Sequence, residues 1–444
     1  MPAGAYYDRE LETKPWAEIQ ALTFERARAQ IERVHALSPL YRRKFDEAGV
    51  KPGDIRGPDD LARIPFFEKD EERASQAAAP PLGEHLCVAP DEVVRIYASS
   101  GTTGVPTFFG LTGNDLATWR TIMGRVFWTM GMRPGDVFAG LGNLSMFVGG
   151  VPACDAASAI GACGVPIGAT AGTERTLELV RAVGTTVMGA TPSFAGYLGE
   201  LVEQILGIPA SALGLRRLMV GGEPGGQIPA VRRQITKVWG CPVRDVMGMG
   251  EFAGVMWGES DDEAGMHFCA QAEIHLELVD HETGEPKPFT DGADGELVYT
   301  AVEREATPLV RFRSHDHVKV MMGETPSGRT APRITTLGRT DDMLLVRGIN
   351  VFPSAVRDVV ASFVPRTSGH IRIVLERPGP LVTPPLPVEV EVGPDVVVGP
   401  ELAEEVAGAI RQRLNFTAEV RLIPERTLPR TSLKTQYVHR AYEA

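Results

Sequence analysis

The sequence of 444 residues has no apolar run long enough to cross a bilayer, and its first residues lack the basic and apolar regions of a signal peptide. We therefore expect a cytoplasmic protein without a membrane partner. The five cysteines are scattered and form no CxxC pair. Their spacing therefore gives no indication of a zinc finger or a disulfide framework.

Positive charge is also scarce, because 45 lysines and arginines stand against 57 acidic residues and leave a net charge of -12. Such an acidic chain is a poor candidate for general binding to nucleic acid. Only eight of the 45 are lysines, which makes each lysine a candidate for a specific role. A polyanionic ligand would have to be held by backbone N–H groups and a few well-placed cations.

The remaining composition, 43% hydrophobic and 23% charged, is that of a globular protein with an ample core, and the length indicates two or three domains. Short β-like runs at 136–141, 185–190 and 215–220 alternate with helical ones, which favours α/β layers. Residues 115–131 are predicted to form an amphipathic helix. Its apolar face consists of Leu116, Trp119, Ile122, Met123, Val126, Phe127 and Met130.

The pattern changes after a cluster of turn-forming residues at 321–338. Beyond it, apolar and charged residues alternate over 388–392, as in a half-covered strand, and Leu402, Val406 and Ile410 mark one helix face. We expect a large N-terminal domain of residues 1–337 and a small α+β domain of residues 338–444. The proline-rich segment 378–387 is predicted to be an exposed loop.

The clearest candidate for chemistry is the loop Ser99–Thr107, which follows a strand predicted over 93–97. Its glycines let consecutive N–H groups face an anion, and its hydroxyls add donors and a contact for Mg²⁺. The loop is not a Walker A motif, because no Gly-Lys-Ser/Thr ends it and Val105 stands where a lysine would help. Taken alone, such a segment is as compatible with a polar surface turn.

Further short elements follow in a fixed order along the chain. Their positions are 221–226, which is rich in glycine, 245–251, 309–316, 338–343, 346–353 and 428–434. Glu251 could supply an oxygen ligand for a divalent metal, and Asp316 could accept from both hydroxyls of a ribose. Each element alone has an ordinary structural explanation, such as a strand-to-loop turn, an exposed ion pair or a solvated lysine.

Together and in this order, the elements resemble the adenylate-forming superfamily of acyl-CoA synthetases, luciferases and adenylation domains. The segments 41–45, 191–195 and 348–353 are similar to its phenylacetate–CoA ligase branch in particular. The resemblance implies a large layered α/β domain that binds ATP and the acid, and a small mobile domain. It implies that a carboxylic acid reacts with MgATP to give an acyl-adenylate, from which coenzyme A displaces AMP. It further implies a homodimer.

The resemblance also assigns residues. The residues matched to ATP binding are Ser99, Ser100, Gly101, Thr102, Thr103, Gly104, Gly222, Glu223, Pro224, Asp245, Val246, Met247, Asp316 and Arg339. Lys434 and Glu251 are matched to catalysis, and Glu251 with Thr103 to Mg²⁺. Asp341 is matched to the hinge, and Arg347 and Gly348 to CoA. A lysine that contacts both the carboxylate and the α-phosphate would reduce the repulsion between them.

The chain departs from the branch at Val105, Met247 and Gly250, and most of all over 140–155, where tyrosines and a His-Tyr pair are usual. The residues expected at the acyl pocket are Met146, Phe147, Ser193, Phe194 and Gly248. An apolar slot for an aromatic ring and plain core packing both fit them. We expect an aromatic or arylacetic acid as substrate. A substituted benzoate, a heteroaromatic acid, an amino acid and a non-catalytic nucleotide-binding homologue stay open.

Overall fold

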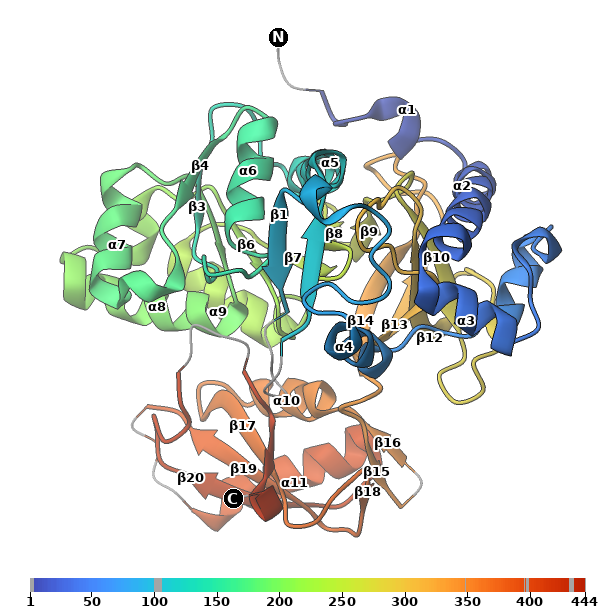
Figure 1. The fold of residues 1–444 in the computed structure, drawn as a ribbon. Coiled ribbons are helices and arrows are strands. Elements are labelled where there is room, and N and C mark those ends of the chain that lie inside the picture. The colour runs from blue at the N-terminus through green and yellow to red at the C-terminus, as the bar shows by residue number, and fades with distance from the viewer. Residues whose placement is uncertain are drawn as a thin grey trace.

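The structure is a computed structural model that describes residues 4–99, 106–347, 349–394, 396, 399–430 and 435–443. It has a large domain, which contains the N-terminus, and a small domain, which contains the C-terminus and packs beneath it in the view of Figure 1. The mixed α/β fold predicted from the sequence is confirmed. The boundary between residues 337 and 338 stays a prediction.

A twelve-stranded sheet forms the centre of the large domain, in the order β11-β10-β12-β13-β14-β9-β8-β7-β6-β5-β3-β4. The parallel half consists of β3 (Val137–Gly140), β4 (Cys163–Pro166), β5 (Val187–Ala190), β6 (Arg217–Gly221) and β7 (Val243–Met249). The antiparallel half consists of β8 (Ala253–Glu259), β9 (Met266–Phe268), β10 (Ile274–Val279), β11 (Pro286–Lys287), β12 (Asp294–Ala301), β13 (Phe312–Met321) and β14 (Arg333–Arg339). Because parallel strands end at one edge, the loops after β5, β6 and β7 gather there.

Helices cover this sheet. They are α1 (Arg9–Glu12), α2 (Trp16–Leu37), α3 (Pro39–Glu47), α4 (Lys69–Ala78), α5 (Gly113–Thr129), α6 (Val151–Ala159), α7 (Thr173–Ala182), α8 (Pro192–Leu206) and α9 (Pro229–Trp239). In Figure 1, α7, α8 and α9 lie beside the parallel half, and α2 and α3 lie beside the antiparallel half. No described helix is both long enough and apolar enough to span a membrane.

The predicted amphipathic helix is α5, and the prediction is confirmed. Thr112 and Asp115 begin it with a capping box, in which the N–H of each is accepted by the other's side chain at 3.0–3.1 Å. Its apolar face is buried against the sheet, where burial of each large side chain contributes roughly 1.5–3 kcal/mol. The buried members are Trp119, Ile122, Met123, Val126, Phe127 and Met130.

A two-stranded antiparallel sheet, β1 (Arg95–Ala98) and β2 (Phe108–Leu111), pairs Ala98 with Phe108 and so brackets the Ser99–Thr107 loop. The prediction placed this strand two residues too early. Val93 instead ends a short 3-10 turn over Pro90–Glu92, which delays the strand.

The small domain has its own hydrophobic core of residues between Leu344 and Ala418. Its strands are β15 (Leu344–Val346), β16 (Ile349–Val351), β17 (Thr367–Leu375), β18 (Leu381–Val382), β19 (Leu386–Val392), β20 (Ala418–Ile423) and β21 (Val438–Arg440). Its helices are α10 (Pro353–Ala361) and α11 (Pro400–Leu414). The predicted helix face of Leu402, Val406 and Ile410 is buried, as expected.

Two predicted irregular segments contain strands. Residues 333–338 belong to β14, and the segment 378–387 contains β18 and the start of β19. In the second segment, Leu381 is 74% exposed, whereas Leu386 is buried in the small-domain core. The turn-forming residues of both segments predicted irregular structure. Parts of each segment form strands instead, because pairing with neighbouring strands overrides the local preference for turns.

Candidate active site

The Ser99–Thr107 loop is closed at its base by side-chain hydrogen bonds. The Ser99 hydroxyl accepts from the N–H of Thr107 at 3.0 Å and from its hydroxyl at 3.1 Å, and the N–H of Ser99 donates to the Thr107 carbonyl at 2.9 Å. These bonds fix the two ends of the loop against each other. The intervening predicted residues Ser100, Gly101, Thr102, Thr103 and Gly104 lie outside the described residues.

Lys69, the first residue of α4, lies at this loop base. Its ammonium donates to the Thr107 hydroxyl at 2.5 Å and contacts the carboxylate of Glu251 directly. Glu72, one turn along α4, lies 3.1 Å from the same ammonium. A lysine far from the loop in sequence thus supplies positive charge beside the loop in which Val105 replaces the expected lysine.

Glu251 is held in the interior by both its backbone and its side chain. It is 8% exposed, and its carbonyl accepts from Arg304 at 2.8 Å. Burial raises the pKa of Glu72 to about 7, partly offset by Lys69 and reinforced by the negative charge of Glu251. Two carboxylates therefore compete for one ammonium in a poorly solvated place.

This donor set fits a magnesium ion. The oxygens of Glu251, Glu72 and Thr107 surround the Lys69 ammonium. Oxygen atoms of the kind that Mg²⁺ prefers therefore lie close together beside the base of the Ser99–Thr107 loop. Mg²⁺ commonly takes one or two carboxylates and completes its shell with phosphate oxygens and water. Among the described residues, no group of three or more His, Cys, Asp and Glu side chains could hold a metal ion alone.

Asp316 and Arg339 lie opposite each other on the paired strands β13 and β14. Arg339 donates to Asp316 at 3.3 Å and forms two bonds to Asp341, at 2.9 and 2.7 Å. Burial opposes the charge of Arg339, but Asp316 and Asp341 outweigh it and place its pKa above the ordinary value. The predicted ribose aspartate, its arginine and the hinge aspartate therefore form one ion-pair network.

The loop after β6 carries Gly222, Glu223 and Pro224, and Gly222 has a positive φ of 84°. Glu223 is 7% exposed, and its carboxylate accepts from Ser193 at the start of α8. This bond joins a residue expected at the adenine to one expected at the acyl pocket. The loops after β5 and β6 are thus tied together at the edge of the parallel sheet.

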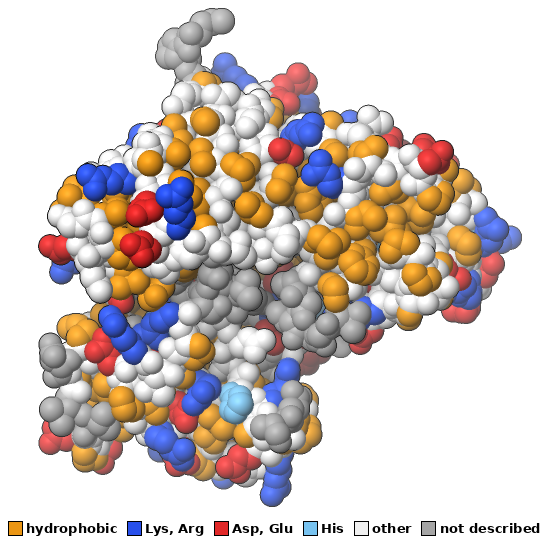
Figure 2. All heavy atoms as spheres, turned by 60° about the vertical axis from the view of Figure 1, so that its left-hand side comes forward, with side chains coloured by type: hydrophobic (Ala, Val, Ile, Leu, Met, Phe, Trp, Pro, Cys, Tyr) orange, Lys and Arg blue, Asp and Glu red, His pale blue; other side chains and the backbone are white. Residues whose placement is uncertain are grey.

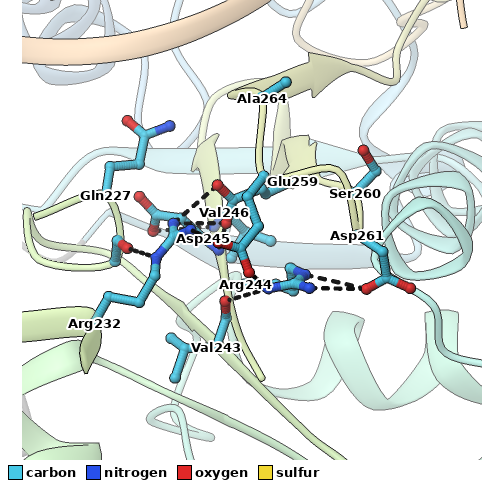
Figure 3. A network of polar contacts seen from close by, with 12 residues as sticks. Gln227, Arg232, Val243, Arg244, Asp245, Val246, Glu259, Ser260, Asp261 and Ala264 are labelled. Atoms are coloured by element: carbon cyan, nitrogen blue, oxygen red, sulfur yellow. Dashed lines mark hydrogen bonds and ion pairs between the residues drawn. The ribbon is translucent and has the colours of Figure 1, made fainter. Parts of the chain in front are cut away.

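Asp245 lies beneath this loop, on β7, in the polar network of Figure 3. Its N–H donates to Glu259 at 3.2 Å, and Glu259 pairs with Arg232 through both oxygens at 2.7–2.9 Å. Arg232 also donates to the Gly226 carbonyl at 2.6 Å. Burial, helped by Glu259, raises the pKa of Asp245 well above its ordinary value. The buried side chain of Asp245 therefore packs directly against Gly226 of this loop, where an added Cβ would lie 2.5 Å from its carboxyl carbon.

The next two residues of β7 differ in exposure, since Val246 is buried and Met247 is half-buried against the main core. At Gly248 the register with β8 shifts, and a Cβ there would lie 2.2 Å from the Gly254 carbonyl. The backbone therefore requires glycine at this position.

The segment expected to shape the acyl pocket packs beside β1. The N–H of Ala98 donates to the Met146 carbonyl at 2.8 Å, and Ala98 forms a bridge with Phe147. Met146 is 44% exposed at a positive φ of 49°, and Phe147 is half-buried. Phe194 is instead buried in the core cluster beneath α8 and stacks on Tyr197, with ring centroids 6.5 Å apart.

Of the two predicted CoA residues, only Arg347 belongs to the described residues. It is exposed, with a positive φ of 51°, at the end of β15. Figure 1 shows β15 and β16 at the right-hand side of the small domain. Gly348 and Lys434 lie outside the described residues.

Sequence reasoning missed three residues that the fold brings to this region, namely Lys69, Glu72 and Arg357. Arg357 of α10 is 4% exposed and donates to the Pro224 carbonyl across the domain interface. The scarcity of lysine was the one signal that could have indicated Lys69. Arginine is abundant, so nothing in the sequence distinguishes Arg357.

Comparison with known proteins assigns the class. The AMP-binding enzyme family matches residues 42–301, and the AMP-binding enzyme C-terminal domain matches residues 348–440. The chain therefore belongs to the AMP-binding enzyme family. A phenylacetate-coenzyme A ligase of Thermus thermophilus is 35% identical over 445 residues, which span 96% of this chain and 97% of the relative. The chain is an AMP-forming acid–CoA ligase of the phenylacetate–CoA ligase-like branch of the adenylate-forming superfamily.

Solved structures give a second comparison. 2-Hydroxyisobutyryl-CoA ligase in the postadenylation state with 2-HIB-AMP is 29% identical; the match covers 100% of this chain and 94% of the ligase, with a TM-score of 0.91. The same ligase in the thioesterification state, with 2-HIB-AMP and CoA, is 30% identical; the match covers 99% of this chain and 94% of the ligase, with a TM-score of 0.73. The overall structure of this chain is therefore more similar to the postadenylation structure of that ligase than to its thioesterification structure.

Proposed function

We propose that this ligase activates an aromatic or arylacetic carboxylic acid, and that phenylacetate is representative of its substrates. The carboxylate oxygen attacks the α-phosphorus of ATP and displaces pyrophosphate. The thiolate of CoA then attacks the carbonyl carbon of the acyl-adenylate, and AMP leaves. The observation that carries the aromatic assignment is the set of four curated relatives named phenylacetate-CoA ligase, at 31–35% identity over most of their length.

The described residues support a division of labour at the nucleotide. The Ser99–Thr107 loop and Lys69 would neutralise the phosphates and the departing pyrophosphate, work that is mainly electrostatic. Asp316 would accept from the ribose hydroxyls, and Glu251 with Thr103 would hold Mg²⁺. When bound, that ion supplies further charge neutralisation on the phosphates. Lys434 would contact the carboxylate and the α-phosphate.

A second candidate is a small hydroxylated acid. The likeness to 2-hydroxyisobutyryl-CoA ligase, at a TM-score of 0.91, favours it. The half-buried Phe147 and Met247 favour the aromatic acid instead, because both pack against the main core and offer apolar surface beside the loops. Apolar surface contributes about 25 cal/mol per Å² when a ring covers it.

The test is acid-dependent exchange of pyrophosphate into ATP by the purified full chain. The panel contains phenylacetate, benzoate, 2-hydroxyisobutyrate and an amino acid, with a sample that contains no acid. We expect the highest kcat/KM with phenylacetate or benzoate, and AMP release only when acid, ATP and CoA are all present. Preferred exchange with 2-hydroxyisobutyrate would favour the second candidate. No exchange with any acid would contradict the proposed activity.

A further inference from the structure

The carboxylate of Glu223 lies between the two domains and binds both of them. On the large-domain side, one oxygen accepts from the Ser193 N–H at 2.9 Å and from the Ser193 hydroxyl at 2.5 Å. Ser193 lies in the first turn of α8, a helix of 15 residues that Thr191 caps. The carboxylate is therefore fixed at the positive end of a helix dipole, where negative charge is favoured.

The other oxygen of Glu223 accepts from the N–H of Thr435 at 2.8 Å. The Thr435 hydroxyl also lies 3.2 Å from that of Ser193. Thr435 follows Lys434 directly in the sequence. The bond from Glu223 therefore reaches the described residue that is next to the expected catalytic lysine.

The opposite end of the same segment is tied within the small domain. Glu391 on β19 is fully buried and accepts from the N–H of Leu428 at 2.9 Å and from the Arg430 guanidinium at 2.5 and 3.2 Å. The described residues Arg430 and Thr435 are thus each bonded to a buried glutamate, Glu391 and Glu223 respectively. The Glu391 anchor moves with the small domain, whereas the Glu223 anchor belongs to the large domain.

Two more small-domain side chains contact the residue after Glu223. Arg357 of α10 donates to the Pro224 carbonyl, and the Tyr437 hydroxyl lies 3.4 Å from it. Arg357 also donates to the Tyr437 hydroxyl at 2.5 Å. Figure 1 shows the C-terminal segment, in red, extending from the small domain to the large domain below α8 and α9. Side chains and backbone of the small domain therefore bind the loop after β6 at Glu223 and Pro224.

We propose that Glu223 is a positioning residue for adenylate formation, which captures the Thr435 backbone and so places Lys434 at the reacting carboxylate and phosphate. The proposal rests on the proposed two-step function. Any rotation that carries the small domain away breaks the Glu223–Thr435 bond and leaves the Glu391 anchor intact. Glu223 therefore acts in the first half-reaction only, because its bond to Thr435 is absent in the second.

The first test compares both half-reactions in Glu223→Gln, which keeps the side-chain shape and removes the charge. A charge-assisted hydrogen bond is worth about 1.5–3 kcal/mol, so we expect kcat for pyrophosphate exchange to fall by about tenfold or more. Thioester formation from preformed acyl-adenylate should fall by less than about twofold. Equal loss in both half-reactions would overturn the proposal.

The partner side of the bond supplies matched variants. Thr435→Pro removes the N–H that Glu223 accepts, and Thr435→Ala keeps it. We expect the proline variant to lose as much exchange activity as Glu223→Gln and the alanine variant to retain most of it. The double variant Glu223→Gln with Thr435→Pro should lose little more than either alone, because both remove one bond. Additive losses would mean that Glu223 acts elsewhere, for example on the nucleotide, and would contradict the proposal.

A second readout requires no acid substrate. Trypsin cleaves after Arg430 and Lys434, and an anchored segment is a poor substrate for it. In the presence of ATP, we expect Glu223→Gln to be cleaved there several-fold faster than the parent chain, while cleavage after the remote Arg366 is unchanged. If no acid supports pyrophosphate exchange but Glu223→Gln is cleaved faster, the proposed function is wrong and the role of Glu223 in holding Thr435 is still supported. Unchanged cleavage would overturn the anchor itself.

Discussion

At the residue scale, Lys69 offers the sharpest prediction. Lys69→Met keeps the length of the side chain but removes the ammonium that contacts Glu251 and Thr107. We expect pyrophosphate exchange to fall by about tenfold to a hundredfold, because the departing pyrophosphate loses a nearby cation in a poorly solvated site. The measurement is kcat/KM for ATP in the exchange assay.

Lys44→Met is the matched control. Lys44 is also a half-buried lysine paired with a glutamate, since its ammonium lies 2.6 Å from Glu71, but this pair joins α3 to α4 and includes neither Thr107 nor Glu251. The control should lose stability to a similar extent and keep its exchange activity. If both variants retain exchange, Lys69 has no role at the phosphates.

At the element scale, the contact between α2 and β10 should make stability sensitive to acid. His275 on β10 is bonded to the Thr23 hydroxyl of α2 at 2.9 Å, and burial lowers its pKa to about 4. The unfolded chain then binds more protons than the folded chain between about pH 6.5 and 4. The free energy of unfolding therefore falls as pH falls through that window, by up to about 3 kcal/mol from this residue.

His275→Gln, which cannot be protonated, should remove this part of the acid loss. We expect the fall in Tm between pH 7 and pH 4.5 to be smaller than in the parent chain, as measured by calorimetry. His439→Gln, on the exposed strand β21, is the control and should show the parent's fall. If Tm falls as much in His275→Gln as in the parent chain, the buried imidazole does not control the loss of stability in acid.

How far the elements could be predicted depends on the range of the interactions. The helical spacing of Trp119 and Val126 is a local pattern, so this helix was predicted correctly. Lys69 and Glu251 are separated by 182 residues, and only the folded chain brings them together. The role of Asp245 at the nucleotide stays a prediction, whereas its burial against Gly226 and the bond from its N–H to Glu259 depend on contacts that form only in the folded chain.

At the scale of the whole molecule, the chain is more similar to the postadenylation structure of 2-hydroxyisobutyryl-CoA ligase than to its thioesterification structure. We expect the small domain to move before the second half-reaction, and the network of Asp341 with Arg339 lies where the connection begins. Asp341→Pro fixes φ near roughly -65° and removes one N–H. We expect pyrophosphate exchange to survive in this variant and thioester formation to fail.

Asp341→Ala is the control, because it also loses the carboxylate but keeps its torsional freedom, and it should lose less thioester formation. Both steps are followed in the same samples by pyrophosphate release and acyl-CoA appearance. Equal retention of the two steps in the folded proline variant would exclude rotation about Asp341.

The central claim is that Lys434 serves only one of the two half-reactions of this ligase. Its most direct test is the ratio of the two half-reaction rates in Lys434→Ala, with phenylacetate as the acid if the exchange panel supports it. We predict that adenylate formation is abolished or slowed by several orders of magnitude, while transfer of the acyl group from preformed acyl-adenylate to CoA continues at nearly the parent rate. A folded variant in which both rates fall together, or in which adenylate formation persists, would contradict the account.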